Sequence, residues 1–321
     1  ADVLPSLTEL QVLRAGGDDE ASVFTNMYHI QTHRRVRALH RLGDAAEAGS
    51  LRSRTLSELF VPLVWLFLLP NQSGGIDMNM ANEALACIRR MATHLQWGHY
   101  YYWLKRFLRQ LKEHAGKDET SASERLHVRG IVGVLEAFHF PMDEDVEMSD
   151  DPIADESSTQ APPHAIAHDL THDAADARSL PRAQRLALAT TLTTRVLPPL
   201  YEALATKDED RLPARLPLLI GTARLAMYLP SDRRNVELFK VFSELGSALR
   251  SKLQSTRDTC RDMGVQMLRA IGASYLPDVV HELRRILTRG PQLAVCAYTL
   301  HTLLVALAVP AVPGTTPLLT K

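Results

Sequence analysis

The sequence predicts an all-α fold, a solenoid of antiparallel helix pairs, and three observations support this. Residues 255–307 read as three consecutive short amphipathic helices separated by tight breaks. Aromatic residues make up only 6% of the 321 residues, and the leucine- and alanine-rich composition favours helices over strands. No run of alternating apolar and polar residues is flanked by turn signals, so we expect almost no strand.

The C-terminal segment shows how the helices are recognised. Ser255 to Asp258 resembles a capping box at the start of the first helix. Gly272 ends that helix, Pro277 lies in the first turn of the second, and Pro291 opens the third. Three apolar stripes are expected to face the core: Cys260, Met263, Gly264, Met267, Leu268 and Ile271; Leu276, Val279, Val280, Leu283, Ile286 and Leu287; Leu293, Cys296, Leu300, Leu303, Leu304 and Leu307.

Similar patterns predict helices along the rest of the chain, with a break or kink at Pro198-Pro199. The period is loose, about 40 residues for each helix pair, which fits a HEAT-like α-solenoid. We expect helical repeats at 1–141, an acidic insert at 142–180, and repeats at 181–321 that continue the same solenoid. The further helices are predicted at 3–13, 21–43, 56–69, 76–96, 100–114, 121–140, 181–204, 211–229 and 235–253.

The charge is distributed unevenly. Residues 142–177 contain eleven acidic residues and no lysine or arginine. Because this segment has few apolar residues and many like charges, we expect the insert to be largely disordered. The whole chain has a formal charge of −1, so the rest of it carries about +10. A basic folded part favours an RNA-facing surface.

Two blocks of the sequence resemble a known family. The first runs from Ser255 to Leu304 and includes His281-Glu-Leu-Arg-Arg-Ile-Leu-Thr-Arg-Gly; the second runs from Ile76 to Leu111 and includes Tyr-Tyr-Trp-Leu from Tyr101. Both resemble the down-regulated-in-metastasis (DRIM) or U-three-protein-twenty family of giant HEAT-repeat proteins of the small-subunit processome. The chain departs from the family's pattern where Pro291 replaces a usual tyrosine and Ala294 a usual histidine.

The resemblance implies a structural scaffold, not an enzyme, in nucleolar assembly of the small ribosomal subunit. Members of the family act in the 90S pre-ribosome, with the U3 snoRNP, in maturation of the 18S pre-rRNA. It therefore implies pre-rRNA, U3 snoRNA and assembly factors as partners, and a nuclear, nucleolar location. We expect no cofactor, no small-molecule substrate and no membrane; the longest apolar run, 59–69, is too short to span a bilayer.

Two other functions remain open. A karyopherin-like HEAT transport adaptor would share the solenoid, but it would need a concave acidic or Asn/Trp ladder that the sequence does not show. A metal-dependent helical enzyme could use His164, His168 and His172, whose spacing aligns them on one helical face. The HExxH pattern, the GxSxG motif and a phosphate-binding glycine loop are all missing. We therefore predict no catalytic, cofactor or metal residues, and buried reduced thiols at Cys87, Cys260 and Cys296.

Basic residues are the best candidates for binding RNA or a protein partner. They occur in pairs and triplets and would contact the phosphate backbone by charge and shape, because no RNA-recognition, KH or zinc-finger signature is present. The four adjacent aromatics from Tyr100 to Trp103 could stack on bases, but we expect most of them in the core. The candidate binding residues are Arg34, Arg35, Arg37, Arg89, Arg90, Lys105, Arg106, Arg109, Arg284 and Arg285.

Overall fold

A computed structural model of the chain describes residues 5–17, 22–70, 74–113, 121–140, 142, 182–206 and 208–308. Within these ranges every regular element is a helix, which confirms the predicted all-α class. The acidic insert, apart from Met142, and the three clustered histidines lie outside the described residues. Their predicted disorder and the predicted domain boundaries stay predictions.

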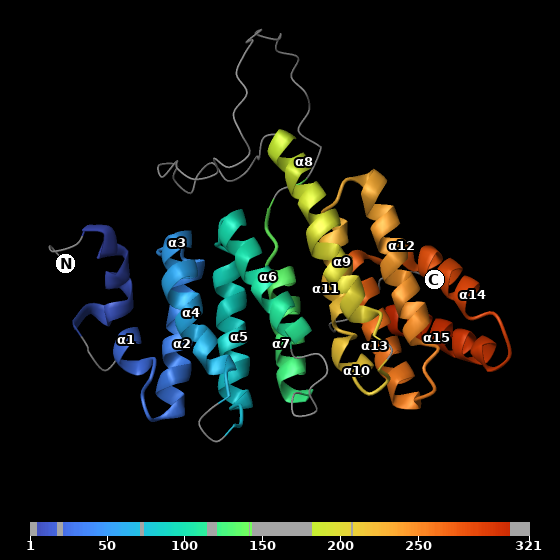
Figure 1. Ribbon diagram of the computed structural model, residues 1–321, viewed down its shortest axis with the longest axis horizontal. Helices are drawn as coiled ribbons and strands as arrows, with labels where there is room; N and C mark the ends of the chain where they lie inside the picture. Colours follow the sequence, from blue (N-terminus) through green and yellow to red (C-terminus); the bar gives the residue numbers. More distant parts are fainter. Residues whose placement is uncertain are drawn as a thin grey trace, which may run out of the picture.

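The helices form two layers along the length of the molecule (Figure 1). In the first layer each helix packs on the next, in the order α2 (Thr32–Glu47), α5 (Met78–Ala92), α7 (Ser121–Glu136), α11 (Leu218–Met227), α13 (Gln254–Ile271) and α15 (Pro291–Ala308). The second layer comprises α3 (Ser53–Thr55), η2 (Leu56–Phe60), α4 (Val61–Trp65), η3 (Leu66–Leu68), α6 (Trp97–Glu113), α8 (Arg182–Thr191), η5 (Leu192–Val196), α9 (Leu197–Leu204), α12 (Ser231–Ala248) and α14 (Leu276–Ile286).

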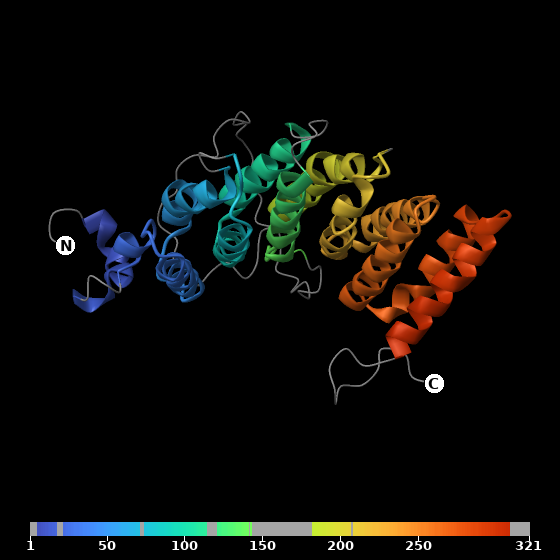
Figure 2. The same cartoon turned by 90° about the horizontal axis from the view of Figure 1, so that it is seen from below.

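Successive first-layer helices begin 36–46 residues apart, except that α7 and α11 begin 97 residues apart. The long interval contains the acidic insert, which lies in the chain between α7 and α8. Even so, α7 packs directly against α11. Seen from below, the array is a shallow arch with α1 (Val23–Asn26) near one end and α15 at the other (Figure 2). This arrangement is a HEAT-like α-solenoid.

Two second-layer helices contain the same irregularity. η2 and η5 are five-residue π-helical turns, and each is followed at the same spacing by a proline, Pro62 or Pro198. Proline has no N–H to donate, and its ring clashes with the carbonyl four residues earlier in a regular α-helix. A π turn widens the helix at that point and accommodates the ring. The break predicted at Pro198-Pro199 is therefore a π turn inside one continuous rod.

Other predicted boundaries were partly wrong. The helix expected at 21–43 is divided into α1 and α2, and the first helix is a 3-10 helix, η1 (Pro5–Gly17). The short helix α10 (Leu212–Arg215) precedes α11. The capping box at Ser255 is not formed, because α13 begins at Gln254 without a side-chain cap. Asp258 instead forms an ion pair with Arg261 one turn further along α13.

The buried apolar side chains of both layers form one continuous core. Most of the predicted C-terminal stripes lie in it, including Cys260, Leu268 and Leu283. The prediction was wrong for Leu293 and Leu304, whose exposed fractions are 56% and 49%. Their helix, α15, buries a narrower stripe, which consists of Cys296, Thr299, Leu303 and Leu307.

By length and composition, α15 alone among the described helices could cross a membrane, with a mean hydropathy of 1.4 over 18 residues. Only 22% of this helix is buried in the fold. It packs beside α13 as the last described helix of the first layer.

One glycine permits an unusually close approach of two helices. A Cβ atom at Gly130 of α7 would lie 2.3 Å from Cε1 of Phe107 in α6, closer than two carbon atoms can approach. Phe107 is fully buried against Trp65 of α4. The absence of a side chain at position 130 therefore makes room for the Phe107 ring between α6 and α7.

Candidate interaction surfaces

The ten predicted binding residues do not form one patch. They lie on four helices: α2 and α5 in the first layer, and α6 and α14 in the second. The α6 and α14 helices are separated by α9 and α12. The ten residues as a set therefore do not line one surface, and the binding role of each residue stays a prediction.

Arg90 is part of the helix packing. Its Nε and Nη2 atoms lie 2.7 Å from the two carboxylate oxygens of Glu47, and Nη2 lies 2.5 Å from Oδ1 of Asp44. Nη1 donates to the carbonyl of His40 at 3.3 Å. A side chain at Gly43 would occupy the space of the guanidinium, 2.6 Å from Nη1. Arg90 thus joins α5 to α2 and is not available to a partner.

This pair predicts an acid-dependent loss of stability. The hydrogen bond from Arg90 holds the pKa of Glu47 below its ordinary value of 4.5. A carboxyl whose folded pKa is lowered stabilises the fold above its unfolded pKa, and this contribution is lost as pH falls through the folded pKa. We expect the urea midpoint to fall as pH drops below 4.5, and to fall less in Glu47→Gln.

Glu244 provides a comparison of opposite sign. Burial raises its pKa above 4.5, so its ionisation at neutral pH opposes folding. Glu244→Gln should therefore raise the urea midpoint at neutral pH, whereas Glu47→Gln should lower it. Equal changes of the urea midpoint in the two variants would contradict the opposite pKa shifts of Glu47 and Glu244.

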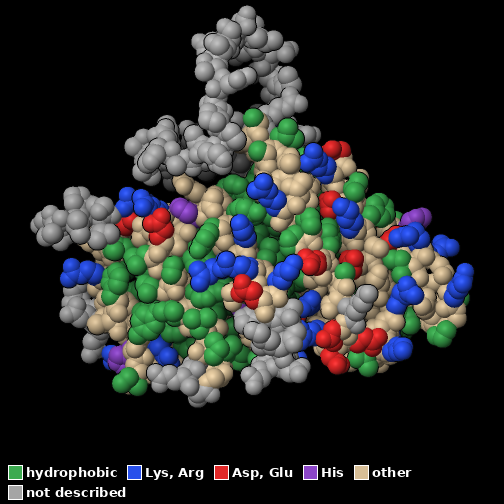
Figure 3. Space-filling model, in the orientation of Figure 1, with side chains coloured by type: hydrophobic (Ala, Val, Ile, Leu, Met, Phe, Trp, Pro, Cys, Tyr) green, Lys and Arg blue, Asp and Glu red, His purple; other side chains and the backbone are tan. Residues whose placement is uncertain are grey.

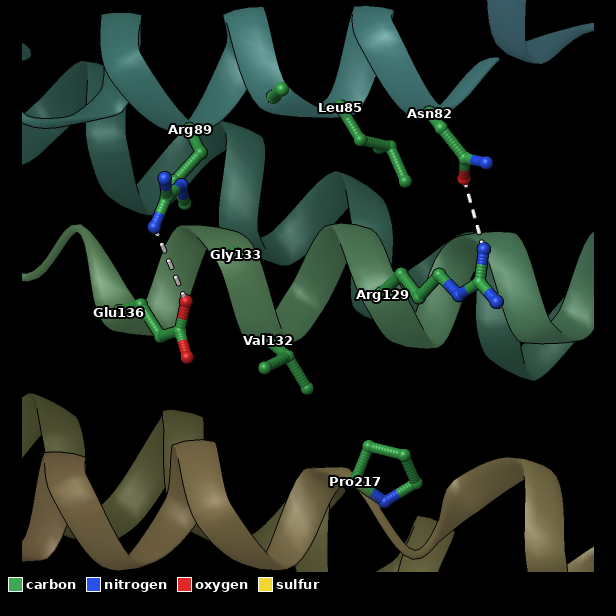
Figure 4. A pocket seen from close by; sticks show the side chains of 9 residues that line it. Asn82, Leu85, Arg89, Arg129, Val132, Gly133, Glu136 and Pro217 are labelled. Carbon is green, nitrogen blue, oxygen red and sulfur yellow. Dashed lines mark hydrogen bonds and ion pairs between the residues drawn. The ribbon is translucent and has the colours of Figure 1, made fainter. Parts of the chain in front are cut away.

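Arg89 lies at one end of a shallow groove of about 260 Å³ between α5, α7 and the start of α11 (Figure 4). Its Nη1 is 3.6 Å from Oε2 of Glu136, and Nη1 of Arg224 donates to Oε1 of the same carboxylate at 2.8 Å. At the other end Arg129 donates to Oδ1 of Asn82 at 2.9 Å. The polar contacts connect three neighbouring first-layer helices, and they contain no nucleophile and base that could form a catalytic pair.

The three candidates on α6 differ from one another. Lys105 is exposed, while Arg109 forms an ion pair with Glu113, with 3.5 Å between Nε and Oε1. The guanidinium carbon of Arg106 lies 4.9 Å from the ring centre of Trp65 and 5.1 Å from that of Trp103. Such stacking is a favourable cation–π contact, and it fixes the direction of the side chain.

The candidates on α14 and α2 are also unequal. Arg285 donates to both carboxylate oxygens of Glu282, at 2.8 and 2.6 Å, and this lowers the pKa of Glu282. Arg284 and Arg37 are exposed and form no ion pair with the part of the chain that the structure describes. Arg34 and Arg35 are half-buried at the start of α2, where Arg35 donates to Oγ1 of Thr32 at 3.0 Å.

The run of aromatic residues is mostly in the core, as predicted. Tyr100 and Trp103 are buried, and their polar atoms are satisfied by the carbonyl of Val134 and the hydroxyl of Ser57. Tyr102 is 56% exposed. One ring of the run is therefore free to meet a partner.

The thiols offer no chemistry. All three cysteines are free and buried, and burial raises the pKa of Cys87 and of Cys260 to about 12 and raises that of Cys296. A thiol with such a pKa is protonated at neutral pH and is a poor nucleophile. Among the described residues, no three histidine, cysteine, aspartate or glutamate side chains are grouped so that they could hold a metal ion.

Several arginines that shape the molecule were missed at the sequence level. Arg215 pairs with Glu124, and Arg269 donates to the carbonyl of Ala306 at 2.8 Å. Each partner is far away in the sequence, and an isolated arginine on an amphipathic helix looks like part of a solvated face. Only the packing of neighbouring helices shows whether such an arginine pairs with another helix or faces solvent.

These features define a HEAT-like α-solenoid protein. Residues 205–318 match the model of a family described as the U3 small nucleolar RNA-associated protein 20 domain. The chain is 29% identical over 306 residues to U3 small nucleolar RNA-associated protein 20 of Schizosaccharomyces pombe, and 26% identical over 299 residues to the protein of that name in Saccharomyces cerevisiae.

These alignments cover 95% and 92% of the chain, but only 11% and 10% of the two relatives. The family match over 205–318 and the two relatives confirm the resemblance inferred from the sequence.

Proposed function

We propose that the chain is part of a structural scaffold in assembly of the small ribosomal subunit, acting with U3 snoRNA in processing of the 18S pre-rRNA. The observation that carries the proposal is the alignment of nearly the whole chain with two proteins named for association with U3 small nucleolar RNA. We place the protein in the nucleolus on the same ground. An extended solenoid suits this function, because a long array presents many spaced surfaces to RNA and assembly factors.

The proposed RNA contact rests on exposed cations that do not take part in helix packing. In the described parts of the chain Arg37, Lys105 and Arg284 are exposed and have no carboxylate partner. Arg90 already neutralises two carboxylates, and Arg109 and Arg285 each neutralise one. Cations without an internal partner can release counterions from phosphates, so the contact should be electrostatic and independent of base sequence.

Filter binding with a structured fragment of pre-rRNA tests this proposal. About three phosphate contacts would give a slope of log affinity against log salt of about −2 to −3. We expect Arg37→Ala, Lys105→Ala and Arg284→Ala, combined in one variant, to weaken binding and flatten this slope. The matched control combines Arg109→Ala with Arg285→Ala, which removes paired cations from two of the same helices and should change the slope less. Binding that is absent, or that does not respond to salt, would contradict RNA contact by this part of the chain.

A further inference from the structure

The second layer has an apolar outer surface near its N-terminal end. The segment from η2 to η3 buries Phe60, Val64 and Trp65 towards the core. On its other side it leaves Leu59, Leu66 and Leu69 exposed, with Leu66 at 50%. The rings of Phe24 and Tyr28 extend this surface, since Tyr28 stacks on Phe67 and donates to the carbonyl of Leu63. In Figure 3 this part of the molecule is a broad hydrophobic patch.

A cationic edge adjoins the apolar surface. Arg106 of α6 lies over the rings of both Trp65 and Trp103 and so bridges α4 and α6. Tyr102 and Lys105 are exposed and precede it within one helical turn, and the ring of Tyr102 meets that of Trp103 edge-on at 5.3 Å. Figure 3 shows basic side chains next to the hydrophobic patch. We call Leu59, Leu66, Tyr102, Lys105 and Arg106 together the apolar–cationic face.

The charges of this face are not compensated from within. Among the described residues, neither Lys105 nor Arg106 forms an ion pair, and Nε of Arg106 is buried without a hydrogen-bond acceptor. The carboxylate of η2, Glu58, is already paired with Arg54, at 2.9 Å between Oε2 and Nε. The face therefore presents leucine side chains on one helix and positive charge on the next.

This combination defines the chemistry of an occupant. Exposed leucine and aromatic side chains on one surface are typical of protein-binding sites, and leucines contribute little to a contact with nucleic acid, whose backbone is charged. An amphipathic helix fits such a face when its apolar stripe covers the leucines. Carboxylates on one flank of that helix would pair with Lys105 and Arg106. A second copy of the chain is a poorer fit, because the same face brings no unpaired carboxylate to these two cations.

We propose that the apolar–cationic face docks an amphipathic helix of a partner protein, with leucine-like side chains on η2 and α4 and acidic side chains over Lys105 and Arg106. The proposal concerns a protein ligand and shares Lys105 with the proposed RNA contact. Leu66→Glu, which alters only the apolar part of the face, distinguishes the two. It assigns different roles to neighbouring residues: Leu59 and Leu66 provide apolar contact, whereas Lys105 and Arg106 select the charge of the ligand.

Defined peptides test the proposal on the full chain. The probe is a fluorescent peptide of about 16 residues, with leucines at i, i+4, i+7 and i+11 and glutamates along one flank. Its counterpart has lysines at the glutamate positions. In fluorescence anisotropy we expect the acidic peptide to bind and the basic one to bind at least tenfold more weakly. Leu66→Glu should weaken binding of the acidic peptide at least tenfold, whereas Leu186→Glu, at an exposed leucine on the distant helix α8, should not.

A charge exchange provides the decisive comparison. Lys105→Glu should weaken binding of the acidic peptide and strengthen binding of the basic one, which a variant that merely misfolds cannot do. Circular dichroism of each variant checks the fold. The proposal is overturned if neither peptide binds, or if Leu66→Glu and Lys105→Glu leave binding of the acidic peptide unchanged. It is also overturned if Leu66→Glu instead abolishes self-association in sedimentation, or abolishes binding of single-stranded oligouridine while peptide binding persists.

Discussion

Replacing Arg215 with methionine is expected to lower the free energy of unfolding by about 3–5 kcal/mol, among the largest effects of any single substitution in this chain. Nε of Arg215 lies 2.5 Å from Oε1 of Glu124, and the exposed fractions of the two side chains are 8% and 4%. Nη1 also donates to the carbonyl of Ala203 at 3.1 Å. The substitution leaves the carboxylate of Glu124 charged, buried and unpaired, and a charge in that state is costly.

The position of this pair adds to its importance. Glu124 lies on α7, before the acidic insert, and Arg215 lies on α10, after it. The pair therefore joins two parts of the solenoid that are 91 residues apart in the chain. Chemical denaturation monitored by circular dichroism measures the loss.

Two controls separate the buried pair from a general effect of lost charge. Adding Glu124→Leu to Arg215→Met should recover most of the stability, because a buried ion pair can be replaced by apolar side chains at little cost. Arg54→Met breaks the exposed pair with Glu58 and should cost less than about 1 kcal/mol. If Arg215→Met were as mild as Arg54→Met, Arg215 would not stabilise the junction.

Replacing Leu283 with aspartate is expected to cost about 4 kcal/mol or more. Leu283 is completely buried on α14, which packs against α12. An aspartate there loses the apolar contacts of leucine and places a carboxylate among the buried apolar side chains of the core. A thermal or urea unfolding curve of the variant measures the effect.

Leu304→Asp is the matched control for this prediction. Both positions are leucines in predicted apolar stripes of adjacent helices, but Leu304 is 49% exposed on α15. Aspartate at Leu304 should stay hydrated and cost no more than about 1 kcal/mol. Similar losses for the two variants would show that the outer side of α15 is buried in solution.

Many residues of the candidate surfaces could be predicted from the sequence. Which of them are exposed and which pack against other helices could not. The residues of α6 were recognised as basic and aromatic, and Tyr102 and Lys105 are indeed exposed. Arg90, however, looked the same as Lys105 on a helical wheel. Arg90 packs between α5 and α2 because Asp44 and Glu47 of α2 lie opposite it, and because Gly43 leaves room for its guanidinium.

The sequence by itself determined the all-α class, the approximate position of most helices, the α-solenoid and the resemblance to a known family. These follow from local properties, since helical periodicity and the helix breaks at glycine and proline depend on residues close in the sequence. Tertiary structure alone decided that α7 meets α11 across the acidic insert, that Leu304 faces outwards, and that Arg215 finds Glu124. These outcomes depend on which helices come to lie side by side, and a side chain is buried or exposed according to neighbours that its own segment does not encode.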